Sequence, residues 1–323
     1  MTKQIRFDVT GGPEVLKLQE VAAIAPGPSE AWIEQEAIGV NFLDVTHRNG
    51  AVPVPIPSGL GVEGSGRVVS IGEGVQNVTV GDRVAYVLGP LGSYASARLI
   101  PVERLVRIPD ELSFDQAAAI MLKGLTAQYL LKAAYPVDAG TIVLMYGVAG
   151  ALGQIMAPWA KHLGAKLIGV VSKESSVASA RSSGCDEVLI WDTCDLPQEV
   201  ARITGGAMAD VVYDGVGRTT FDASLDCLRA RGTMVSIGAT SGIPDPIDIR
   251  RINKTSLYVT RPSLVAYVSD PVEYAERATD LFGAIRDGII EPKVWHSYPL
   301  DQAAEVHKLL EHGDTKGAVL LKP

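Results

Sequence analysis

The chain has 323 residues, of which 47% are hydrophobic and 20% are charged, and its formal net charge at pH 7 is −8. At about 100 to 200 residues per domain, this length predicts two domains with ordinary hydrophobic cores. The negative charge argues against a nucleic-acid backbone as the main partner, because proteins that bind one usually present a basic stripe to the phosphates.

The cysteines and the first residues favour a cytoplasmic protein. Cys185, Cys194 and Cys227 are scattered, odd in number and never part of a C-x-x-C pair, which is typical of free thiols in a reducing compartment. Neither they nor the dispersed histidines have the spacing of a zinc site. The segment MTKQIRFDVTGG is not followed by the apolar core of a secretory signal. We therefore expect a cytoplasmic protein that binds no metal.

The first 122 residues have the pattern of an antiparallel β domain. Short β-type runs such as AWIEQEAIGV, GRVVSIG and GDRVAYVL are separated by the turn-forming segments PGPS, PVPIPSGLG and GPLGS. One helix, over about residues 114 to 131, leads out of this region.

Residues 140 to 260 alternate between strands and helices. The runs TIVLMYG, KLIGVVS, EVLI, DVVYDGV and GTMVSIG predict strands, and GALGQIMAPWAKHLG, SVASARSSG and FDASLDCLRARG predict helices between them. Alternation of this kind builds a parallel sheet covered by helices on both faces, so the fold class is α/β with a doubly wound sheet.

The C-terminal part predicts a helix over about residues 270 to 287 and a second, amphipathic helix in PLDQAAEVHKLLEHG, followed by the apolar run KGAVLLKP. We expect this part to return to the first domain. The predicted domains are therefore 1–122 with 263–323, and 123–262.

The segment from Ala139 to Ala160 has no charged side chain over 22 residues, which raises the question of a membrane span. Glycines and Pro158 interrupt it, so a strand, a turn and a helix account for it better. Gly147 would make the turn, and Gly150 and Gly153 would let backbone, helix and a phosphate approach closely. The spacing is G-x-x-G-x-x-G, and its position between a strand and a helix favours dinucleotide binding. The alternative is that the glycines only allow the helix to pack on the strand.

The end of the next strand bears on the choice of cofactor. NAD-selective folds place an acidic residue there for the ribose 2′-hydroxyl, whereas folds that bind NADP remove that charge and supply a cation. Ser172 and Lys173 therefore favour NADPH. NADH is not excluded, because Glu174 is adjacent and SKES can also be interpreted as a helix N-terminus.

Several motifs together resemble one family over nearly the whole chain, from Gly11 to Leu321. They are GVNFLDVTHRNG, PSGLGVEGSGRVVSIGEGV, AAAIMLKGLTAQYLL, VVYDGVG and SLYVTRPSL. These segments resemble the zeta-crystallin-like quinone oxidoreductases of the zinc-independent medium-chain dehydrogenases/reductases. The resemblance implies a Rossmann-type nucleotide-binding domain over 123–262 and a GroES-like, mainly antiparallel β catalytic domain from the remaining segments.

Zinc enzymes of this superfamily have a histidine where this chain has Val62 and a zinc-binding cysteine near Asn41. Loss of the imidazole and the thiolate predicts that zinc is not held, which leaves hydride transfer to an acceptor that needs no Lewis acid. The expected activity is a flavin-free, NADPH-dependent quinone reductase. Reduction of an enone or enal double bond is an alternative. A nucleotide-binding structural or RNA-binding protein with little turnover is another.

The resemblance also implies the site residues. Asn41, Lys123 and Thr126 match family residues near the nicotinamide and its ribose, although Lys123 could instead be a solvated helix residue. The cofactor-binding candidates are Gly147, Gly150, Ala151, Leu152 and Gly153 at the pyrophosphate; Ser172, Lys173 and Ser176 at the adenosine ribose; and Trp191, Val216, Gly238, Ser241, Ser263 and Leu264 along the rest.

The chain departs from the family pattern at several positions, one of which is Trp191, where the family has a tyrosine. The lysine for the 2′-phosphate corresponds to Ser176, so Lys173 would have to replace it, and a second basic residue corresponds to Gly313. Two tyrosines of the substrate pocket correspond to Thr46 and Val52, which removes stacking surface for a flat quinone. This loss is the reason to consider an alkene substrate.

Two further expectations concern the proton donor and the assembly. The motifs identify no proton donor, and His47 is interpreted as a structural residue. The segment SLYVTRPSL predicts an edge strand after the nucleotide-binding sheet, and we expect a homodimer to form through it.

Overall fold

The computed structural model describes residues 1–315 and 317–323 and divides the chain into two units. The first unit contains Met1–Leu125, Asp270–Phe282 and Glu291–Pro323, and the second contains Thr126–Ser269 and Gly283–Ile290. Residues 123–125 thus lie in the first unit, and 263–269 and 283–290 in the second. The division differs from the predicted domains by these residues because two long helices, α2 (Phe114–Tyr129) and α9 (Pro271–Arg286), each contribute to both units.

The first unit contains a seven-stranded sheet in the order β15-β16-β3-β5-β6-β8, with β7 also paired to β3, and a small sheet in the order β2-β1-β4. Its pairs are antiparallel except β15 with β16. The strands are β1 (Thr2–Phe7), β2 (Lys17–Val21), β3 (Glu30–Val40), β4 (Ser58–Gly59), β5 (Glu63–Ile71), β6 (Arg83–Val87), β7 (Ala97–Pro101), β8 (Val106–Arg107), β15 (Val294–Pro299) and β16 (Ala318–Lys322).

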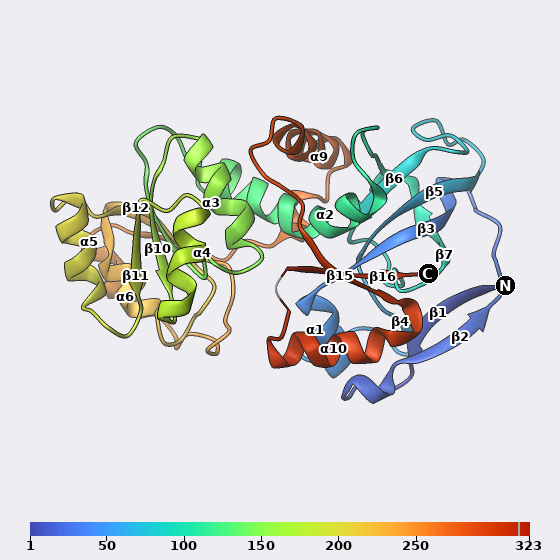
Figure 1. The fold of residues 1–323 in the computed structure, drawn as a ribbon, viewed down its shortest axis with the longest axis horizontal. Helices are drawn as coiled ribbons and strands as arrows, with labels where there is room; N and C mark the ends of the chain where they lie inside the picture. The colour runs from blue at the N-terminus through green and yellow to red at the C-terminus, as the bar shows by residue number, and fades with distance from the viewer. Residues whose placement is uncertain (316) are drawn as a thin grey trace. The chain divides into compact units, whose positions relative to one another are not determined.

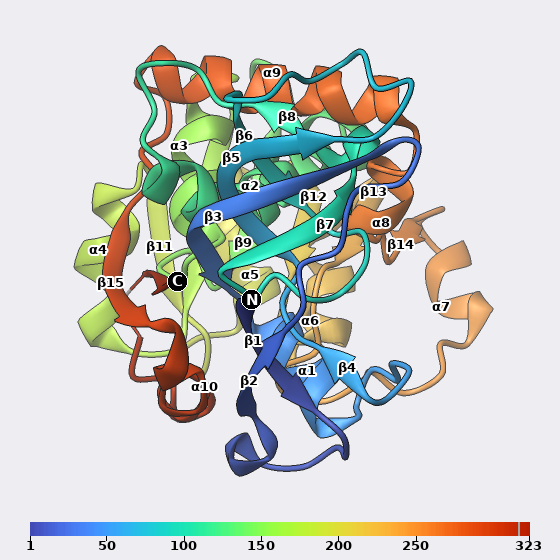
Figure 2. The same ribbon diagram turned by 90° about the vertical axis from the view of Figure 1, so that its right-hand side faces the viewer.

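Strand β3 is the centre of this sheet, and Figure 2 shows it beside β5 and β6. Alternate residues such as Ala31 and Ile33 are fully buried, as expected for a strand with one face on a core. Strand β16 pairs with β3, Val319 opposite Val40, so the C-terminal segment belongs to the sheet of the first unit. The remaining helices of this unit are α1 (Phe42–Asn49) and α10 (Ala303–His312), with short 3-10 turns at Pro13–Val15, Val102–Arg104 and Leu300–Gln302.

The second unit is a six-stranded parallel sheet in the order β11-β10-β9-β12-β13-β14. Its strands are β9 (Ile142–Tyr146), β10 (Lys166–Val171), β11 (Glu187–Ile190), β12 (Ala209–Asp214), β13 (Leu228–Ser236) and β14 (Tyr258–Thr260). The strand order reverses between β9 and β12, which is the arrangement of a doubly wound sheet that binds its ligand at that point.

Helices cover both faces of this sheet, with α3 and α4 on one and α5 and α6 on the other (Figure 1). The helices are α3 (Gly153–His162), α4 (Val177–Ser182), α5 (Leu196–Thr204), α6 (Phe221–Asp226), α7 (Ile249–Asn253) and α8 (Leu264–Tyr267), with a π-helical turn at Leu130–Ala134 and a 3-10 turn at Glu174–Ser176. Between the layers, Leu144, Val212 and Met234 are buried in one hydrophobic cluster.

The uncharged segment 139–160 and the helix that follows β12 can both be compared with their predictions. The segment 139–160 contains β9, the glycine turn and part of α3, and no helix among the described residues is long and apolar enough to span a bilayer. The helix expected over FDASLDCLRARG is shorter than predicted, because it ends at Asp226 and the following residues enter β13. Pairing of Leu228 with Ala209 of β12 overrides the helical pattern there.

Candidate functional site

The glycine loop joins β9 to α3 and needs glycine at two positions for different reasons. Gly147 has φ of +64°, a backbone conformation that side chains other than glycine rarely adopt. A Cβ atom on Gly153 would lie 2.5 Å from both the Cα and the carbonyl oxygen of Val148, so only glycine fits where α3 begins. Gly150 donates its N–H to the carbonyl of Gly147 at 2.8 Å, which closes the turn.

Backbone donors at the start of α3 are available to a ligand. The N–H groups of Ala151, Leu152 and Gly153 have no acceptor in the part of the chain that the structure describes. The N-terminal end of a helix also carries partial positive charge from the aligned peptide dipoles. Together these features fit the doubly negative pyrophosphate of a dinucleotide.

The other cofactor-binding candidates follow strands of the same sheet. Ser172, Lys173 and Ser176 come after β10, Trp191 after β11, Val216 after β12, Gly238 and Ser241 after β13, and Ser263 and Leu264 after β14. All six strands are parallel, so their carboxyl ends meet at one edge of the sheet. The structure therefore brings all the candidates of the second unit to a single edge.

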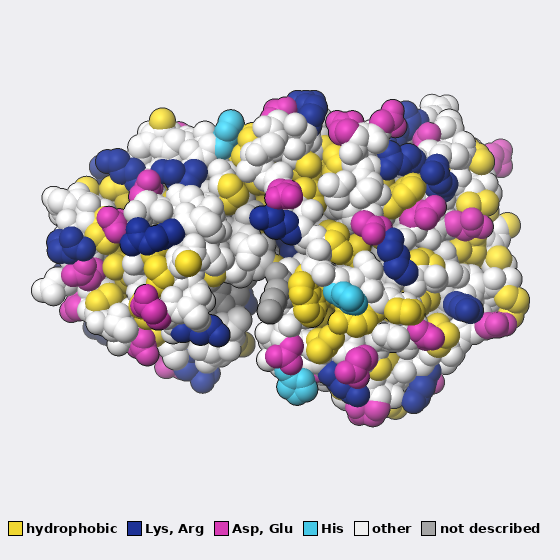
Figure 3. Space-filling view, viewed as in Figure 1, with side chains coloured by type: hydrophobic (Ala, Val, Ile, Leu, Met, Phe, Trp, Pro, Cys, Tyr) yellow, Lys and Arg dark blue, Asp and Glu magenta, His cyan; other side chains and the backbone are white. Residues whose placement is uncertain are grey.

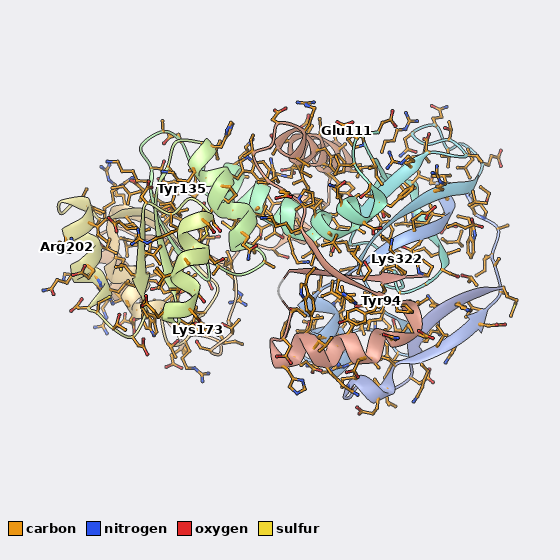
Figure 4. The ribbon with its side chains drawn as sticks, in the orientation of Figure 1. Tyr94, Glu111, Tyr135, Lys173, Arg202 and Lys322 are labelled. Atoms are coloured by element: carbon orange, nitrogen blue, oxygen red, sulfur yellow. The ribbon has the colours of Figure 1, made fainter. Side chains whose placement is uncertain are left out.

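Lys173 begins the turn after β10 and carries an unpaired charge. Its carbonyl accepts the N–H of Ser176 at 3.0 Å, so the two residues belong to the same tight turn. Lys173 is exposed (Figure 4) and forms no ion pair with any described residue, and the adjacent Glu174 forms none either. A free ammonium group at this place suits a phosphate on the adenosine ribose.

Hydrogen bonds join the loop after β12 to the loop after β13. Ser241 donates its N–H and its hydroxyl to the carbonyl of Val216, both at 2.8 Å, and accepts the N–H of Thr219. Gly238 lies so close to the backbone of Gly215 that a Cβ atom would be 2.7 Å from its carbonyl oxygen. The polar atoms of Ser241 are thus used to hold the loop of Val216 in place.

Asp214, the last residue of β12, supports the same loop and was not among the residues predicted for the site. Its carboxylate is fully buried and accepts the N–H groups of Val216 and Gly217 at 2.7 and 3.1 Å. The hydroxyls of Thr220 and Ser224 donate to its other oxygen. A buried carboxylate with four donors fixes the loop rather than reacting with a ligand.

Trp191, Ser263 and Leu264 lie at the ends of the sheet. The Trp191 ring packs edge-on against Tyr146, with 5.8 Å between ring centroids, so it continues the core to the carboxyl edge. Ser263 is exposed and directly precedes α8, whose first residue is the half-buried Leu264.

The first unit contains a buried polar cluster formed by Lys123, Asn41 and Glu63. Lys123 Nζ donates to Asn41 Oδ1 at 2.7 Å, and Asn41 Nδ2 donates to Glu63 Oε2 at 2.7 Å. Glu63 Oε1 accepts the N–H of Leu122 at 2.7 Å. Asn41 is 3% exposed and Glu63 is 0% exposed, whereas Lys123 is half-buried. Lys123 is therefore held by the protein and is not a freely solvated helix residue.

This cluster brings together residues that are distant in the sequence. Burial raises the pKa of Glu63, and the charge of Lys123 opposes that rise. A Cβ atom on Gly39 would lie 2.4 Å from Glu63 Oε2 and from the carbonyl oxygen of Ala118, so β3 passes the cluster with no room for a side chain. Nothing in the sequence except its place next to Val62 indicated a role for Glu63, and its hydrogen bond with Asn41 was not predicted.

Asp44 holds the backbone of Asn41 at the start of α1. Its Oδ2 accepts the Asn41 N–H at 2.9 Å and the Tyr94 hydroxyl at 3.0 Å, while Oδ1 has no partner among the described residues. Burial raises the pKa of Asp44 from 3.8 to about 7, and the hydrogen bonds from Asn41 and Tyr94 oppose the rise. Asn41 is thus fixed by one carboxylate at its backbone and by another at its side chain.

Replacing Asp44 with asparagine should change how stability depends on pH. The Asp44 carboxyl loses its proton near pH 4 in the unfolded chain but near pH 7 in the folded one, so the wild-type protein loses stability as the pH rises between these values. At about 1.4 kcal/mol per pH unit, this loss is at most about 4 kcal/mol. We expect Asp44→Asn to lack it, as measured by chemical denaturation at about pH 5 and pH 8. Asp8→Asn, at an exposed position, is the control. An equal change with pH in wild type and Asp44→Asn would contradict the prediction.

The remaining candidates are Thr46 and Val52 in the first unit and Thr126 at the start of the second. Val52 donates its N–H to the carbonyl of Thr46 at 3.0 Å, so the two substrate-pocket candidates are adjacent. The Thr46 hydroxyl donates to the Leu43 carbonyl, and Val52 is 39% exposed. Thr126 is one turn after Lys123 on α2 and so lies on the same side of that helix.

Three further features bear on the site: the environment of His47, the grouping of potential metal ligands and the distribution of surface charge. His47 is buried, and its Nδ1 has no partner among the described residues. In the described ranges, 1–315 and 317–323, no three His, Cys, Asp or Glu side chains form a group that could hold a metal ion. On the one face that Figure 3 displays, Lys and Arg side chains are interspersed with Asp and Glu, and no basic stripe is seen among the residues coloured there.

Comparison with known proteins gives matches over the whole chain. Residues 27–110 match the model for the alcohol dehydrogenase GroES-like domain, and residues 151–282 match the model for zinc-binding dehydrogenases. A quinone oxidoreductase of Pseudomonas aeruginosa is 42% identical over 100% of both chains. A 2-haloacrylate reductase of a Burkholderia species is 42% identical over 97% of this chain and 96% of its own. The crystal structure of Escherichia coli quinone oxidoreductase complexed with NADPH superposes with a TM-score of 0.94, at 42% identity and full coverage of both chains.

Proposed function

We propose that this chain, which belongs to the quinone oxidoreductase family of the medium-chain dehydrogenases/reductases, reduces a quinone with a hydride from NADPH. The observation that carries the proposal is the start of α3, where three backbone N–H groups lack acceptors within the described chain. They lie at the sheet edge to which every other cofactor candidate of the second unit belongs. NADPH supplies the hydride, and the protein supplies binding, orientation and charge.

We assign the two ends of the cofactor to different side chains. Ala151, Leu152 and Gly153 bind the pyrophosphate through their N–H groups, and Lys173 binds the 2′-phosphate that distinguishes NADPH from NADH. The support for Lys173 is its unpaired ammonium group in the turn that also contains Ser176, where the family lysine is missing.

Lys173→Ala should weaken NADPH binding about tenfold, which corresponds to about 1.4 kcal/mol for one exposed charge–phosphate contact. NADH lacks the 2′-phosphate, so its dissociation constant should not change. Both constants can be measured by fluorescence titration. The matched control is Lys166→Ala, because Lys166 is an exposed lysine at the opposite end of the same strand, β10. Equal weakening for NADPH and NADH, or no change for NADPH, would refute the assignment.

We assign to Lys123, in the first unit, the stabilisation of the negative charge that develops on the hydride acceptor. A quinone oxygen gains negative charge as hydride arrives at the ring, and an ammonium group that hydrogen-bonds to it lowers the energy of that state. Asn41 Oδ1 holds the ammonium at 2.7 Å and Glu63 orients the Asn41 amide, so the donor is positioned before the acceptor binds. Thr126, one turn further along α2, is assigned to the nicotinamide ribose.

The proposed activity can be tested by following the absorbance of NADPH. We expect NADPH to be oxidised when benzoquinones or naphthoquinones are added to the purified protein without flavin or metal. Failure of every quinone to increase the oxidation of NADPH would reject the proposal.

A second candidate activity is reduction of an activated carbon–carbon double bond. Thr46 and Val52 are adjacent where the family pattern has two tyrosines, so the aromatic surface that would stack on a flat ring is lost. The 2-haloacrylate reductase relative bears the name of a reaction of this class. Comparing kcat/KM for a quinone with that for an enone, an enal and a haloacrylate would separate the two activities.

We also propose a cytoplasmic homodimer. Support for the dimer is the edge strand β14, whose Tyr258 is 63% exposed, because an unpaired strand edge is a template for pairing with a second copy. Support for the compartment is that Cys185, Cys194 and Cys227 are all free thiols. Sedimentation that yields only particles of one chain's mass would reject the dimer.

A further inference from the structure

A chain of buried hydrogen bonds leads from Asp44 to the C-terminal helix α10. The Tyr94 hydroxyl lies 3.0 Å from Asp44 Oδ2 and 3.1 Å from His307 Nε2. His307 Nδ1 lies 3.3 Å from Arg48 Nη1, and Arg48 binds Glu311 through both of its terminal nitrogens. Tyr94 and His307 are 0% exposed and Arg48 is 1% exposed, so solvent does not compete for the bonds among these three side chains and Asp44; Glu311, at 33% exposed, is where the chain of bonds reaches the surface. Figure 4 shows Tyr94 beside α10.

The chemistry of the groups fixes the direction of every bond in this chain. Arginine can only donate, so His307 Nδ1 must accept, and the ring proton is therefore on Nε2. Nε2–H then donates to the Tyr94 oxygen, which leaves the Tyr94 proton to donate to Asp44. Burial and the charge of Arg48 lower the pKa of His307 to about 3, so the ring stays neutral and keeps this arrangement near neutral pH.

Tyr94 also contacts the segment that leads to Glu63. A Cβ atom on Gly61, whose φ is +94°, would lie 2.3 Å from the ring carbon Cδ1 of Tyr94. The Tyr94 N–H donates to the carbonyl of Leu60 at 2.8 Å. Tyr94 thus touches Asp44 through its hydroxyl, and its ring packs on the backbone of Gly61, two residues before Glu63.

We propose that Tyr94 and His307 are positioning residues, which fix the two carboxylates that hold Asn41 and thereby set the place of the Lys123 ammonium. The inference rests on the proposed function, because it assigns these residues to the reaction at Lys123. His307 acts through Tyr94 and touches none of the reacting groups. The bonds run in one direction, from Arg48 to Asp44. Loss of the Tyr94 hydroxyl removes a donor from Asp44, which holds the Asn41 backbone, and loss of the His307 ring removes the donor that holds the Tyr94 hydroxyl in place.

Three variants test the proposal by kinetics. Tyr94→Phe keeps the ring on Gly61 and removes the hydroxyl, and His307→Leu removes both ring nitrogens. We expect each to lower kcat with a quinone about tenfold, since small displacements of a catalytic group are costly, while the KM for NADPH stays unchanged. His307→Gln offers an amide oxygen to Arg48 and an amide N–H to Tyr94, so it should restore roughly half of the wild-type kcat.

A matched control separates positioning from loss of a buried hydroxyl. Tyr274 is 1% exposed in the same unit, and its hydroxyl bonds the backbone of Arg104 and Val87, outside the chain that leads to Asn41. Tyr274→Phe should lower the melting temperature about as much as Tyr94→Phe but leave kcat unchanged. An equal fall of kcat in Tyr274→Phe, a wild-type kcat in Tyr94→Phe, or no recovery in His307→Gln would overturn the proposal.

Crystal structures of the wild type and Tyr94→Phe distinguish failure of this inference from failure of the proposed function. If the wild type reduces no quinone, the proposed function fails, but the hydrogen bond from Lys123 to Asn41 can still be compared. Its loss or lengthening from 2.7 Å in Tyr94→Phe would support positioning. An unchanged bond would overturn the inference.

Discussion

Lys123→Met should lower kcat for quinone reduction by about two orders of magnitude, the usual loss when one donor to a developing oxyanion is removed. Methionine preserves the length and packing of the side chain but not the ammonium group. Asn41 Oδ1 then loses its donor, and Glu63, fully buried, loses the nearby positive charge that opposes the rise of its pKa. The pyrophosphate and the 2′-phosphate are assigned to the second unit, so the dissociation constant for NADPH should change little.

The control for Lys123→Met is Lys308→Met. Lys308 is an exposed lysine on α10 of the same unit, and its ion pair with Glu305 at 3.2 Å lies at the surface, where such pairs contribute little. Stopped-flow measurement of NADPH oxidation with a saturating quinone gives the rate of hydride transfer directly. A wild-type rate in Lys123→Met would contradict the assignment of the acceptor chemistry to Lys123.

Gly153→Ala should abolish measurable NADPH binding, a loss of more than about a hundredfold in affinity. The added Cβ atom would meet backbone atoms of Val148 at 2.5 Å, and backbone cannot move aside as a flexible side chain can. Either the start of α3 or the turn at Gly147 must shift, which misdirects the N–H groups of residues 151–153. Such overpacking also costs about 1–3 kcal/mol of stability.

The control for this variant is Gly283→Ala. Gly283 lies inside α9, and among the described residues, apart from the backbone of its own helix, an added Cβ would meet only the guanidinium Nη2 of Arg286, at 3.8 Å. Alanine should therefore be tolerated there and favour the helix by up to about 1 kcal/mol. Circular dichroism should confirm that both variants are folded, and fluorescence titration should show NADPH binding in Gly283→Ala alone. NADPH binding of wild-type strength in Gly153→Ala would contradict the assignment of the loop.

More of the second unit than of the first could be predicted from the sequence. A parallel sheet places the carboxyl ends of its strands at one edge, so motifs that follow predicted strands can be assigned to a common site from their order alone. Periodicity failed after Asp226, where pairing with β12 and β14 draws Leu228 and the following residues into a strand that a helical pattern had concealed.

The polar cluster of the first unit could be predicted only in part. Asn41 and Lys123 follow from the family resemblance, but the supports of Asn41 come from β5, from the loop that holds Tyr94 and from α10. These contacts join residues that no local pattern relates, and a buried glutamate or tyrosine looks like any other in a strand or loop. No motif in the sequence therefore distinguishes His307 from the other histidines of this unit, and its contact with Tyr94 appears only in the fold.

The position of β16 has a consequence for synthesis of the chain. Residues 318–322 lie between β15 and β3 in the interior of the seven-stranded sheet, whereas Thr126–Ser269 of the second unit are continuous and precede them. A ribosome therefore releases a nearly complete nucleotide-binding unit while β3, made much earlier, still lacks its neighbour. The incomplete sheet leaves an edge of β3 open throughout that interval, and such edges pair readily with other chains. In the growing polypeptide, the half that carries Lys123 is therefore the part that completes its sheet last.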